Sequence, residues 1–201
     1  MKAEQILNSD DFQQCQTFHG HVCPGLSMGY VAGKLALAWL QENKSEDEEV
    51  VAIVENDSCF VDAVQVLTGC TFGKGNFIYK DYGKMALTLI SRNSGRGVRV
   101  CLRPGAFVPD EEHFGLLRKV MSGEASEEER ARFHQVHQRR SMDLLETPAA
   151  DLFEVTPMEG SLPEKARIEP SQICSRCGET VMATKMVVAG DGNICRACAG
   201  W

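Results

Sequence analysis

Apolar and polar residues are spaced along the first 146 residues in ways that predict both helices and strands. Apolar positions three and four residues apart predict helices over 10–17, 24–41, 59–68, 110–122 and 126–145. Short runs of apolar and β-branched residues predict strands at 50–54, 85–90 and 98–102, with a hairpin turn at 93–97. The fold class that follows is α+β, a mixed helix and sheet core followed by helices.

Local signals support these elements. Val50–Val54 contains no polar residue, which is typical of a strand buried on both faces. Pro24 falls in the first turn of its helix, where proline is favourable. Gly25, Gly29 and Gly33 lie four residues apart on one face of that helix. Another backbone could approach closely there, and ordinary helix packing is the interpretation that we adopt.

Composition changes after residue 146 and divides the chain. Residues 1–146 form the predicted core with its helical extension, and Ser126 with Glu129 has the signature of a capping box. Prolines and glycines then indicate a linker over 147–172, with one strand at 152–156. Residues 173–201 form a small cysteine-rich module.

Charge and hydropathy exclude some classes of protein. The chain has 201 residues, a net charge of −7 and a pI of about 5.3, which disfavours a strongly basic nucleic-acid binder. No apolar run approaches the ~20 residues of a membrane-spanning helix. The N-terminus has no apolar segment typical of a secretory signal, so we expect a cytoplasmic protein. Nine cysteines in such a chain indicate metal ligands or reactive thiols rather than disulfides.

Four cysteines near the C-terminus form two C-x₂-C pairs, separated by seventeen residues: Cys174, Cys177, Cys195 and Cys198. Four converging thiolates are the ligand set of a structural zinc site. A redox dithiol and an iron–sulfur cluster are the alternatives. Residues 159–201 contain five acidic and five basic residues, which gives little electrostatic reason to bind DNA. We therefore expect this zinc finger to have a structural or interface role.

A second set of potential ligands lies in the core. His19, His21 and Cys23 alternate, so in an extended chain their side chains share one side. Imidazole and thiolate are ligands for zinc, iron, nickel or copper. Cys23 precedes the helix 24–41, whose dipole would favour the thiolate.

Cys59 stands at the start of the helix 59–68, with Asp62 one turn later on the same face and Gln65 near its edge. Apolar residues occupy another face of that helix, so Cys59 and Asp62 could face a cleft. We predict Cys59, Asp62 and His19 as catalytic residues, and Cys59 as a further ligand beside His19, His21 and Cys23. The alternative is that the two cysteines are buried packing residues and the histidines are hydrogen-bonded polar groups.

The other candidate residues carry weaker signals. Three cysteines are assigned to structural roles, and three histidines in the helical region show no ligand pattern: Cys15, Cys70 and Cys101, and His113, His134 and His137. Residues 78–103 contain six Lys or Arg and one Asp. This basic segment could bind an anion, but a solvated surface or a subunit contact is the preferred interpretation.

Three ordered motifs resemble those of the FmdE family, which takes its name from formylmethanofuran dehydrogenase. They are Phe18-His19-Gly20-His21-x-Cys23-Pro24-Gly25, then Glu55-x-Asp57-x-Cys59-x-x-Asp62-Ala63-x-Gln65, then Thr68-Gly69-Cys70-Thr71-x-Gly73-Lys74-Gly75-Asn76. Cys174-x-x-Cys177-Gly178-Glu179 resembles the zinc finger appended to some members.

The resemblance implies an α+β core, a homodimer with exchanged elements, and an association with a molybdenum or tungsten redox enzyme of C1 metabolism. It places His19, His21, Cys23, Cys59 and Asp62 in a metal-containing cleft, which could hold a second transition metal besides the zinc. Three functions follow: a metal-assisted redox enzyme or a subunit of a larger redox-enzyme complex, an accessory protein that handles metal or cofactor, and a zinc-finger adaptor. The core motifs disfavour the adaptor, because an adaptor needs no His/Cys set outside its finger.

Overall fold

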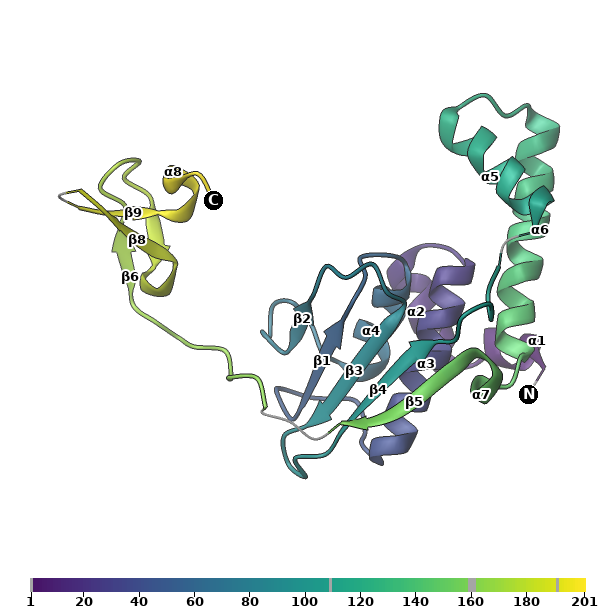
Figure 1. The fold of residues 1–201 in the computed structure, drawn as a ribbon, viewed down its shortest axis with the longest axis horizontal. Coiled ribbons are helices and arrows are strands. Elements are labelled where there is room, and N and C mark those ends of the chain that lie inside the picture. Colours follow the sequence, from purple (N-terminus) through teal and green to yellow (C-terminus); the bar gives the residue numbers. More distant parts are fainter. Residues whose placement is uncertain (1, 109, 159–161, 191) are drawn as a thin grey trace. The chain divides into compact units, whose positions relative to one another are not determined.

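The computed structural model describes the chain except for residues 1, 109, 159–161 and 191. The chain divides into two compact units, Met1–Lys165 and Ala166–Trp201 (Figure 1). The first unit contains the predicted mixed helix and sheet core, and the second contains the C-terminal cysteines. Among the described helices, none combines the length and the apolar character needed to cross a membrane.

A five-stranded mixed sheet forms the centre of the first unit. Its strands run in the order β2-β1-β3-β4-β5, with β1 and β2 parallel and the other neighbours antiparallel. Their bounds are β1 (Val50–Val54), β2 (Phe77–Tyr79), β3 (Ala86–Ser91), β4 (Gly97–Leu102) and β5 (Phe153–Met158). The hairpin between β3 and β4 is confirmed, and the parallel pairing of the short strand β2 makes the sheet mixed.

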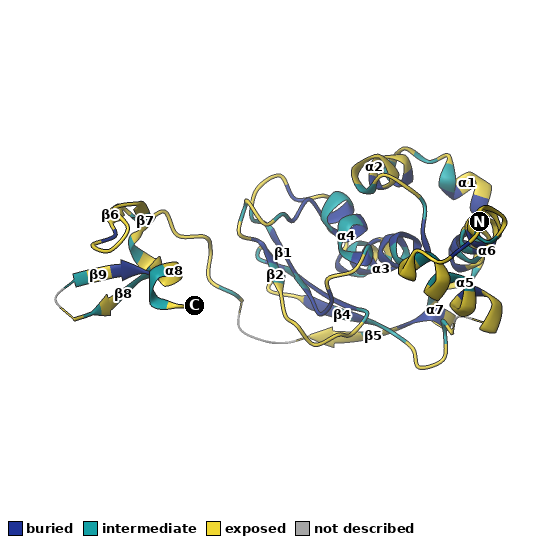
Figure 2. Cartoon of the chain, turned by 90° about the horizontal axis from the view of Figure 1, so that it is seen from above, coloured by how far each residue is buried: buried dark blue, intermediate teal, exposed yellow. Residues whose placement is uncertain are grey.

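Helices cover one face of this sheet. The long helix α3 (Pro24–Leu40) packs on β3 and β4, and α4 (Phe60–Thr68) packs on α3 and β1. Figure 2 shows the buried residues of these helices and strands facing one another. The core stripe of α4 is fully enclosed, since Phe60 and Val64 have no exposed surface and Leu67 is 7% exposed. Helices α1 (Ala3–Leu7) and α2 (Asp10–His19) pack around this layer.

The glycines of α3 permit its unusually close contact with α4. A Cβ atom on Gly29 would lie 2.1 Å from the carbonyl oxygen of Phe60, whereas one on Gly33 would meet only the side chain of Leu67, at 2.9 Å. The close backbone approach is therefore real at Gly29, and its role is helix packing, as the sequence suggested.

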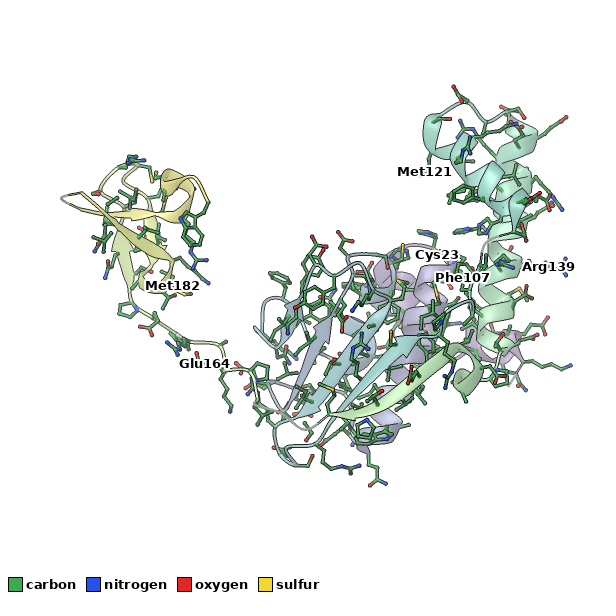
Figure 3. All side chains as sticks on the ribbon, in the orientation of Figure 1. Cys23, Phe107, Met121, Arg139, Glu164 and Met182 are labelled. Atoms are coloured by element: carbon green, nitrogen blue, oxygen red, sulfur yellow. The ribbon has the colours of Figure 1, made fainter. Side chains whose placement is uncertain are left out.

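Two further helices form an arm on the first unit. Helix α5 (Glu111–Ser122) packs against α6 (Glu127–Glu146), and α6 also packs on α3 and α1. Figure 3 shows Met121 near the outer end of this arm, where it is 80% exposed. The predicted capping box is present, because Ser126 Oγ accepts from the N–H of Glu129 and Glu129 accepts from the N–H of Ser126.

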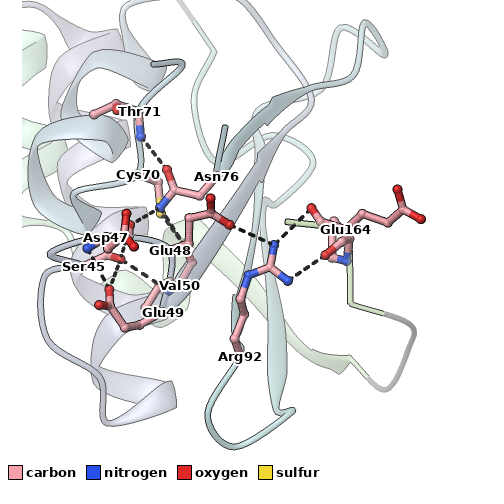
Figure 4. A network of polar contacts seen from close by, with 11 residues as sticks. Ser45, Asp47, Glu48, Glu49, Val50, Cys70, Thr71, Asn76, Arg92 and Glu164 are labelled. Carbon is pink, nitrogen blue, oxygen red and sulfur yellow. Dashed lines mark hydrogen bonds and ion pairs between the residues drawn. The ribbon is translucent and has the colours of Figure 1, made fainter. Parts of the chain in front are cut away.

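The glycine-rich segment after α4 is tied to the acidic loop before β1 (Figure 4). Asn76 is fully buried, and its side-chain amide donates to the carbonyl oxygens of Asp47 and Val50, each at 2.9 Å. Its own Oδ1 accepts from the N–H of Thr71 at 3.0 Å. Asn76 therefore has a structural role in holding both loops.

The basic segment is largely paired within the chain. Arg99 makes a two-point ion pair with Glu55, with N···O distances of 2.7 and 2.9 Å. Arg103 donates to the carbonyl oxygen of Ala150. Both arginines are thus engaged by groups of the same chain. This argues against an anion site at Arg99 and Arg103 in and after β4.

The structure places part of the expected linker in the sheet. Helix α7 (Ala149–Leu152) leads into β5, which pairs with β4 along six residue pairs from Phe153 to Met158. The division between the two units falls after Lys165. The strand expected at 152–156 thus exists, and it belongs to the first unit.

The second unit consists of two short hairpins and a terminal helix. Its elements are β6 (Ser171–Ile173), β7 (Thr180–Met182), a 3₁₀ turn (Ala183–Lys185), β8 (Met186–Ala189), β9 (Gly192–Cys195) and α8 (Arg196–Ala199). Among the residues described in this unit, only Cys174, Ile194 and Cys195 are buried at its centre. Its apolar core is therefore very small.

Candidate functional site

The core site begins where α2 ends. His19 is the last residue of α2, so the three candidate ligands do not lie on an extended chain as the sequence suggested. Gly20 turns the backbone with a φ of 97°, a left-handed conformation that favours glycine. Cys23 then caps α3, and its sulfur accepts from the N–H of Leu26 at 3.3 Å. The turn at Gly20 brings the three residues together.

The ligand atoms of His19, His21 and Cys23 all lie within 4.8 Å of one another. His19 Nε2 is 3.6 Å from Cys23 Sγ, and the rings of His19 and His21 have centroids 4.5 Å apart. His21 is exposed, His19 is half-buried and Cys23 is buried. The three side chains therefore lie close together, although not along an extended chain.

Asp62 orients His19 from the neighbouring helix. It stands in the first turn of α4, and its Oδ2 accepts from His19 Nδ1–H at 2.7 Å. That hydrogen bond leaves the lone pair of Nε2 facing Cys23. A carboxylate that fixes the ring of a histidine in this way is common behind metal ligands.

Cys59 lies next to Cys23. It immediately precedes α4, is half-buried, and packs with Cys23 in one cluster. A Cβ on Gly25 would be 2.9 Å from the Cβ of Cys59, so the glycine makes room for this cysteine. The site therefore combines two neighbouring thiols with two imidazoles and a carboxylate.

The protonation of the site follows from burial. Burial raises the pKa of Cys23 to about 12, with a smaller contribution from the neighbouring Cys59 and against the opposing N–H of Leu26. The N–H groups at the start of α3 do favour a Cys23 thiolate, as predicted, but burial outweighs them in the protein alone. Burial lowers the pKa of His21, as do the nearby His19 and His134. The His21 imidazole is therefore neutral near pH 7.

The four C-terminal cysteines converge in the second unit. Their sulfur atoms lie within 4.8 Å of one another, and those of Cys177 and Cys195 are 4.0 Å apart. Cys174 accepts from the N–H of Cys195 at 3.2 Å, and Cys195 accepts from the N–H of Cys198 at 3.3 Å. Zinc–sulfur bonds of about 2.3 Å in a tetrahedron place sulfurs about 3.8 Å apart. The cluster therefore fits one four-coordinate metal ion.

Backbone N–H groups favour the thiolate form of one cysteine in this cluster, and a thiolate is the form that binds a metal ion. Those of Cys177 and Cys195 lower the pKa of Cys174 to about 6. All nine cysteines lie in the described part of the chain and are free thiols. Cys15 and Cys70 are fully buried and belong to packing clusters.

A cavity of about 790 Å³ is lined by residues of α2, of α4 and of the glycine-rich segment, and by none of the core-site residues. It is lined by residues next to the site in sequence, including Phe18, which precedes His19, and Gln65, one turn after Asp62. Lys74 of the glycine-rich segment also lines it, and Phe18 is 60% exposed. The dimensions suit an organic molecule of cofactor size.

Sequence reasoning missed a group of histidines on the arm. His113 and His137 are hydrogen-bonded to each other, with Nε2 and Nδ1 2.9 Å apart, and His134 lies one turn before His137. His21 and His134 line one cavity with His137. The three-residue spacing of His134 and His137, which places both on one face of a helix, was the feature of the sequence that could have indicated this group. Their proximity to His21 comes from the fold.

Comparison with known proteins gives likenesses in sequence and in structure. Residues 18–154 match the family model described as "FmdE, Molybdenum formylmethanofuran dehydrogenase operon". The chain is 36% identical over 194 residues to an Archaeoglobus fulgidus protein named "Probable S-adenosyl-L-methionine-binding protein", covering 93% of this chain and 52% of that one. The chain thus spans about half the length of this curated relative.

The third likeness is structural. A protein from Syntrophus aciditrophicus, described as a "tungsten formylmethanofuran dehydrogenase subunit e (fmde)-like protein", has a crystal structure that matches this chain with a TM-score of 0.61. The two sequences are 27% identical, and the match covers 98% of this chain and 92% of that one. The likeness therefore extends over both units of the chain.

Proposed function

Because the chain belongs to the FmdE family, we propose that it is a metal-binding protein with two metal sites. The C-terminal cluster holds a structural zinc ion, and the core site holds a second transition-metal ion. The observation that supports the core site is the convergence of His19, His21 and Cys23, with His19 fixed by Asp62. A transition metal there would supply Lewis-acid or redox chemistry.

The residues of the core have distinct proposed roles. His19, His21 and Cys23 are the ligands, and Asp62 orients His19 and can accept a proton from it. Cys59, beside Cys23, is a further thiol that can ligate or react with a substrate. The protein would act with, or as a relative of, a molybdenum or tungsten redox enzyme of C1 metabolism. The alternative is a non-catalytic protein that handles metal or cofactor for such an enzyme.

The experiment is elemental analysis of the full chain purified without oxygen and without added metal. We expect two metals per chain in the wild type and one in His21→Ala, because this exposed ligand can be removed without disturbing the core. The zinc of the finger, retained in the variant, is the internal control. One metal per chain in the wild type, after incubation with zinc, nickel, cobalt or iron, would contradict the core site.

The thiol at position 59 needs its own control. Cys59→Ser should alter the absorption spectrum of the cobalt-loaded core site or abolish an activity, whereas Cys101→Ser should do neither. Both cysteines are half-buried and lie outside the described groups of converging ligand atoms, but Cys59 packs beside Cys23 and Cys101 lies in β4. Identical behaviour of the two variants would leave Cys59 without a special role.

A second candidate function is binding of S-adenosyl-L-methionine, supported by the likeness to the archaeal relative and by the 790 Å³ cavity. Phe18 offers an aromatic face, while Asp10 and Lys74 offer opposite charges for an amino-acid group. Titration calorimetry should give saturable binding that Phe18→Ala weakens by about tenfold, the loss expected for one stacked base. No heat of binding in the wild type would exclude this candidate.

The homodimer and the partnership with a larger enzyme stay predictions. So does the structural or interface role of the finger. The neutral charge balance of residues 159–201 still disfavours nucleic acid as its partner.

A further inference from the structure

A cavity of about 490 Å³ lies between the turn that follows α2 and the middle of α6. His21, a proposed metal ligand, forms part of one wall. The opposite wall comes from α6. The side chains that line it include Gln16 and His21 on one side and Phe133, His134, His137 and Gln138 on the other. The cavity therefore borders the core site on the side of His21.

His137 is held rigidly in this wall. Its Nδ1 lies 2.9 Å from Nε2 of His113, and its ring packs against Phe133 with centroids 4.7 Å apart. His113 is only 3% exposed, so it is fixed within the arm. Since Nδ1 of His137 is engaged, Nε2 is the nitrogen left for a ligand.

One tautomer satisfies this pair best. If His113 Nε2–H donates to His137 Nδ1, the hydrogen on His137 lies on Nε2 and can be donated to a ligand. His113 Nδ1 is buried and has no hydrogen-bond partner in the described structure. In this tautomer that nitrogen carries no hydrogen, so no buried N–H is left unpaired.

The hydrogen-bonding groups and charges of the lining side chains indicate what kind of ligand the cavity can bind. The lining side chains that the structure describes include imidazoles and carboxamides, but no carboxylate and no lysine or arginine. Imidazole and amide N–H groups donate to oxygen acceptors. The absence of carboxylates from this lining removes repulsion against an anion, whereas no fixed positive charge is available to neutralise several negative ones.

We propose that this cavity is the substrate pocket of the core site and binds a small carboxylate or another oxyanion of single charge. The anion accepts a hydrogen bond from His137 Nε2–H, and its other end faces His21. His113 is a positioning residue that fixes the tautomer and the orientation of His137. This inference rests on the proposed function, since the cavity can be a substrate pocket only if His21 holds a metal ion at the core site.

The test is an NMR titration of the metal-loaded full chain with sodium acetate, followed through the imidazole signals. We expect saturable shifts for His137 and His21. His137→Ala should weaken acetate binding by about tenfold or more, the value of one hydrogen bond to a charged group. Gln135→Ala, on the same helix but outside the lining, is the matched control and should bind acetate as the wild type does.

His113 provides a test that a purely structural role would fail. His113→Phe fills the site without a donor and should weaken acetate binding, while His113→Gln can still donate to His137 Nδ1 and should restore it. Equal affinity in the wild type, His137→Ala and His113→Phe would overturn the pocket.

The metal content of the same samples separates this inference from the proposed function. Two metals per chain with acetate binding independent of His137 would overturn the pocket and leave the metal site standing. Acetate binding that depends on His137 but is equally strong in a chain with only the finger metal would overturn the link to the core metal.

Discussion

Substitution of Gly29 by alanine is expected to prevent stable folding of the first unit. The new Cβ would lie 2.1 Å from the carbonyl oxygen of Phe60, 2.8 Å from its carbonyl carbon and 2.9 Å from its Cα. These are backbone atoms, so no side-chain rotation relieves the clash. Helix α4 would have to move away from α3 and take Cys59 and Asp62 with it.

The expected loss exceeds the ~1–3 kcal/mol of ordinary overpacking. It is large against a total stability of about 5–15 kcal/mol. Urea unfolding followed by circular dichroism gives the free energy of unfolding, and the amount of folded protein recovered gives a second measure if the variant does not fold.

Two other glycines supply graded controls. Gly33→Ala meets only Cδ1 of Leu67 at 2.9 Å, the end of a flexible side chain, and should cost little. Gly115→Ala in α5 meets nothing within 4 Å and should stabilise the helix by up to ~1 kcal/mol. Equal stability of the Gly29 and Gly33 variants would contradict the close approach of the two helices.

Most regular elements could be predicted because their signals are local. The apolar run Val50–Val54, the capping box at Ser126 and the proline that opens α3 each act within a few residues. The observed bounds differ from the predicted ones by one or two residues in most of these elements. Strand β2 was missed because Phe77–Tyr79 is too short to show a period.

The site was predictable in its residues but not in its geometry. Spacing identified His19, His21 and Cys23, yet the expected extended chain is wrong, since His19 ends a helix and Gly20 makes the turn. The protonation of Cys23 was also beyond the sequence, because burial in the fold outweighs the dipole of α3.

The histidines of the arm show most clearly what could not be predicted from the sequence. His113 and His137 are twenty-four positions apart in sequence and meet only because α5 folds back on α6. Their contact with the cavity at His21 depends on the packing of α6 against α3. Contacts between residues so far apart along the chain produce no periodic pattern in a single sequence.

Removal of metal from the C-terminal cluster is expected to unfold residues 166–201 and leave the first unit folded. Of the residues described in the second unit, only Cys174, Ile194 and Cys195 are buried at its centre, and its strands have three or four residues each. So small a core cannot offset the chain entropy of folding. Structural zinc contributes about 10–16 kcal/mol in comparable sites.

Cys195→Ser tests this expectation without a chelator. Cys195 is buried, ends β9, and accepts the N–H of Cys198. Serine can accept the same N–H as an N-cap, so the variant removes the thiolate ligand and keeps the cap. In ¹⁵N-edited NMR spectra we expect the signals of residues 166–201 to collapse to random-coil positions, with those of residues 2–108 unchanged.

Cys101→Ser is the matched control, because this half-buried cysteine lies in β4 of the first unit and outside the described metal-ligand groups. In the Cys101→Ser variant, the NMR signals of residues 166–201 should stay dispersed and the zinc of the finger should stay bound. Dispersed signals from residues 166–201 in the Cys195 variant would mean that the hairpins fold without metal. Iron with visible absorption, in place of zinc, would instead indicate one iron ion on the same four thiolates, since the spacing of the sulfurs suits a single tetrahedral metal ion.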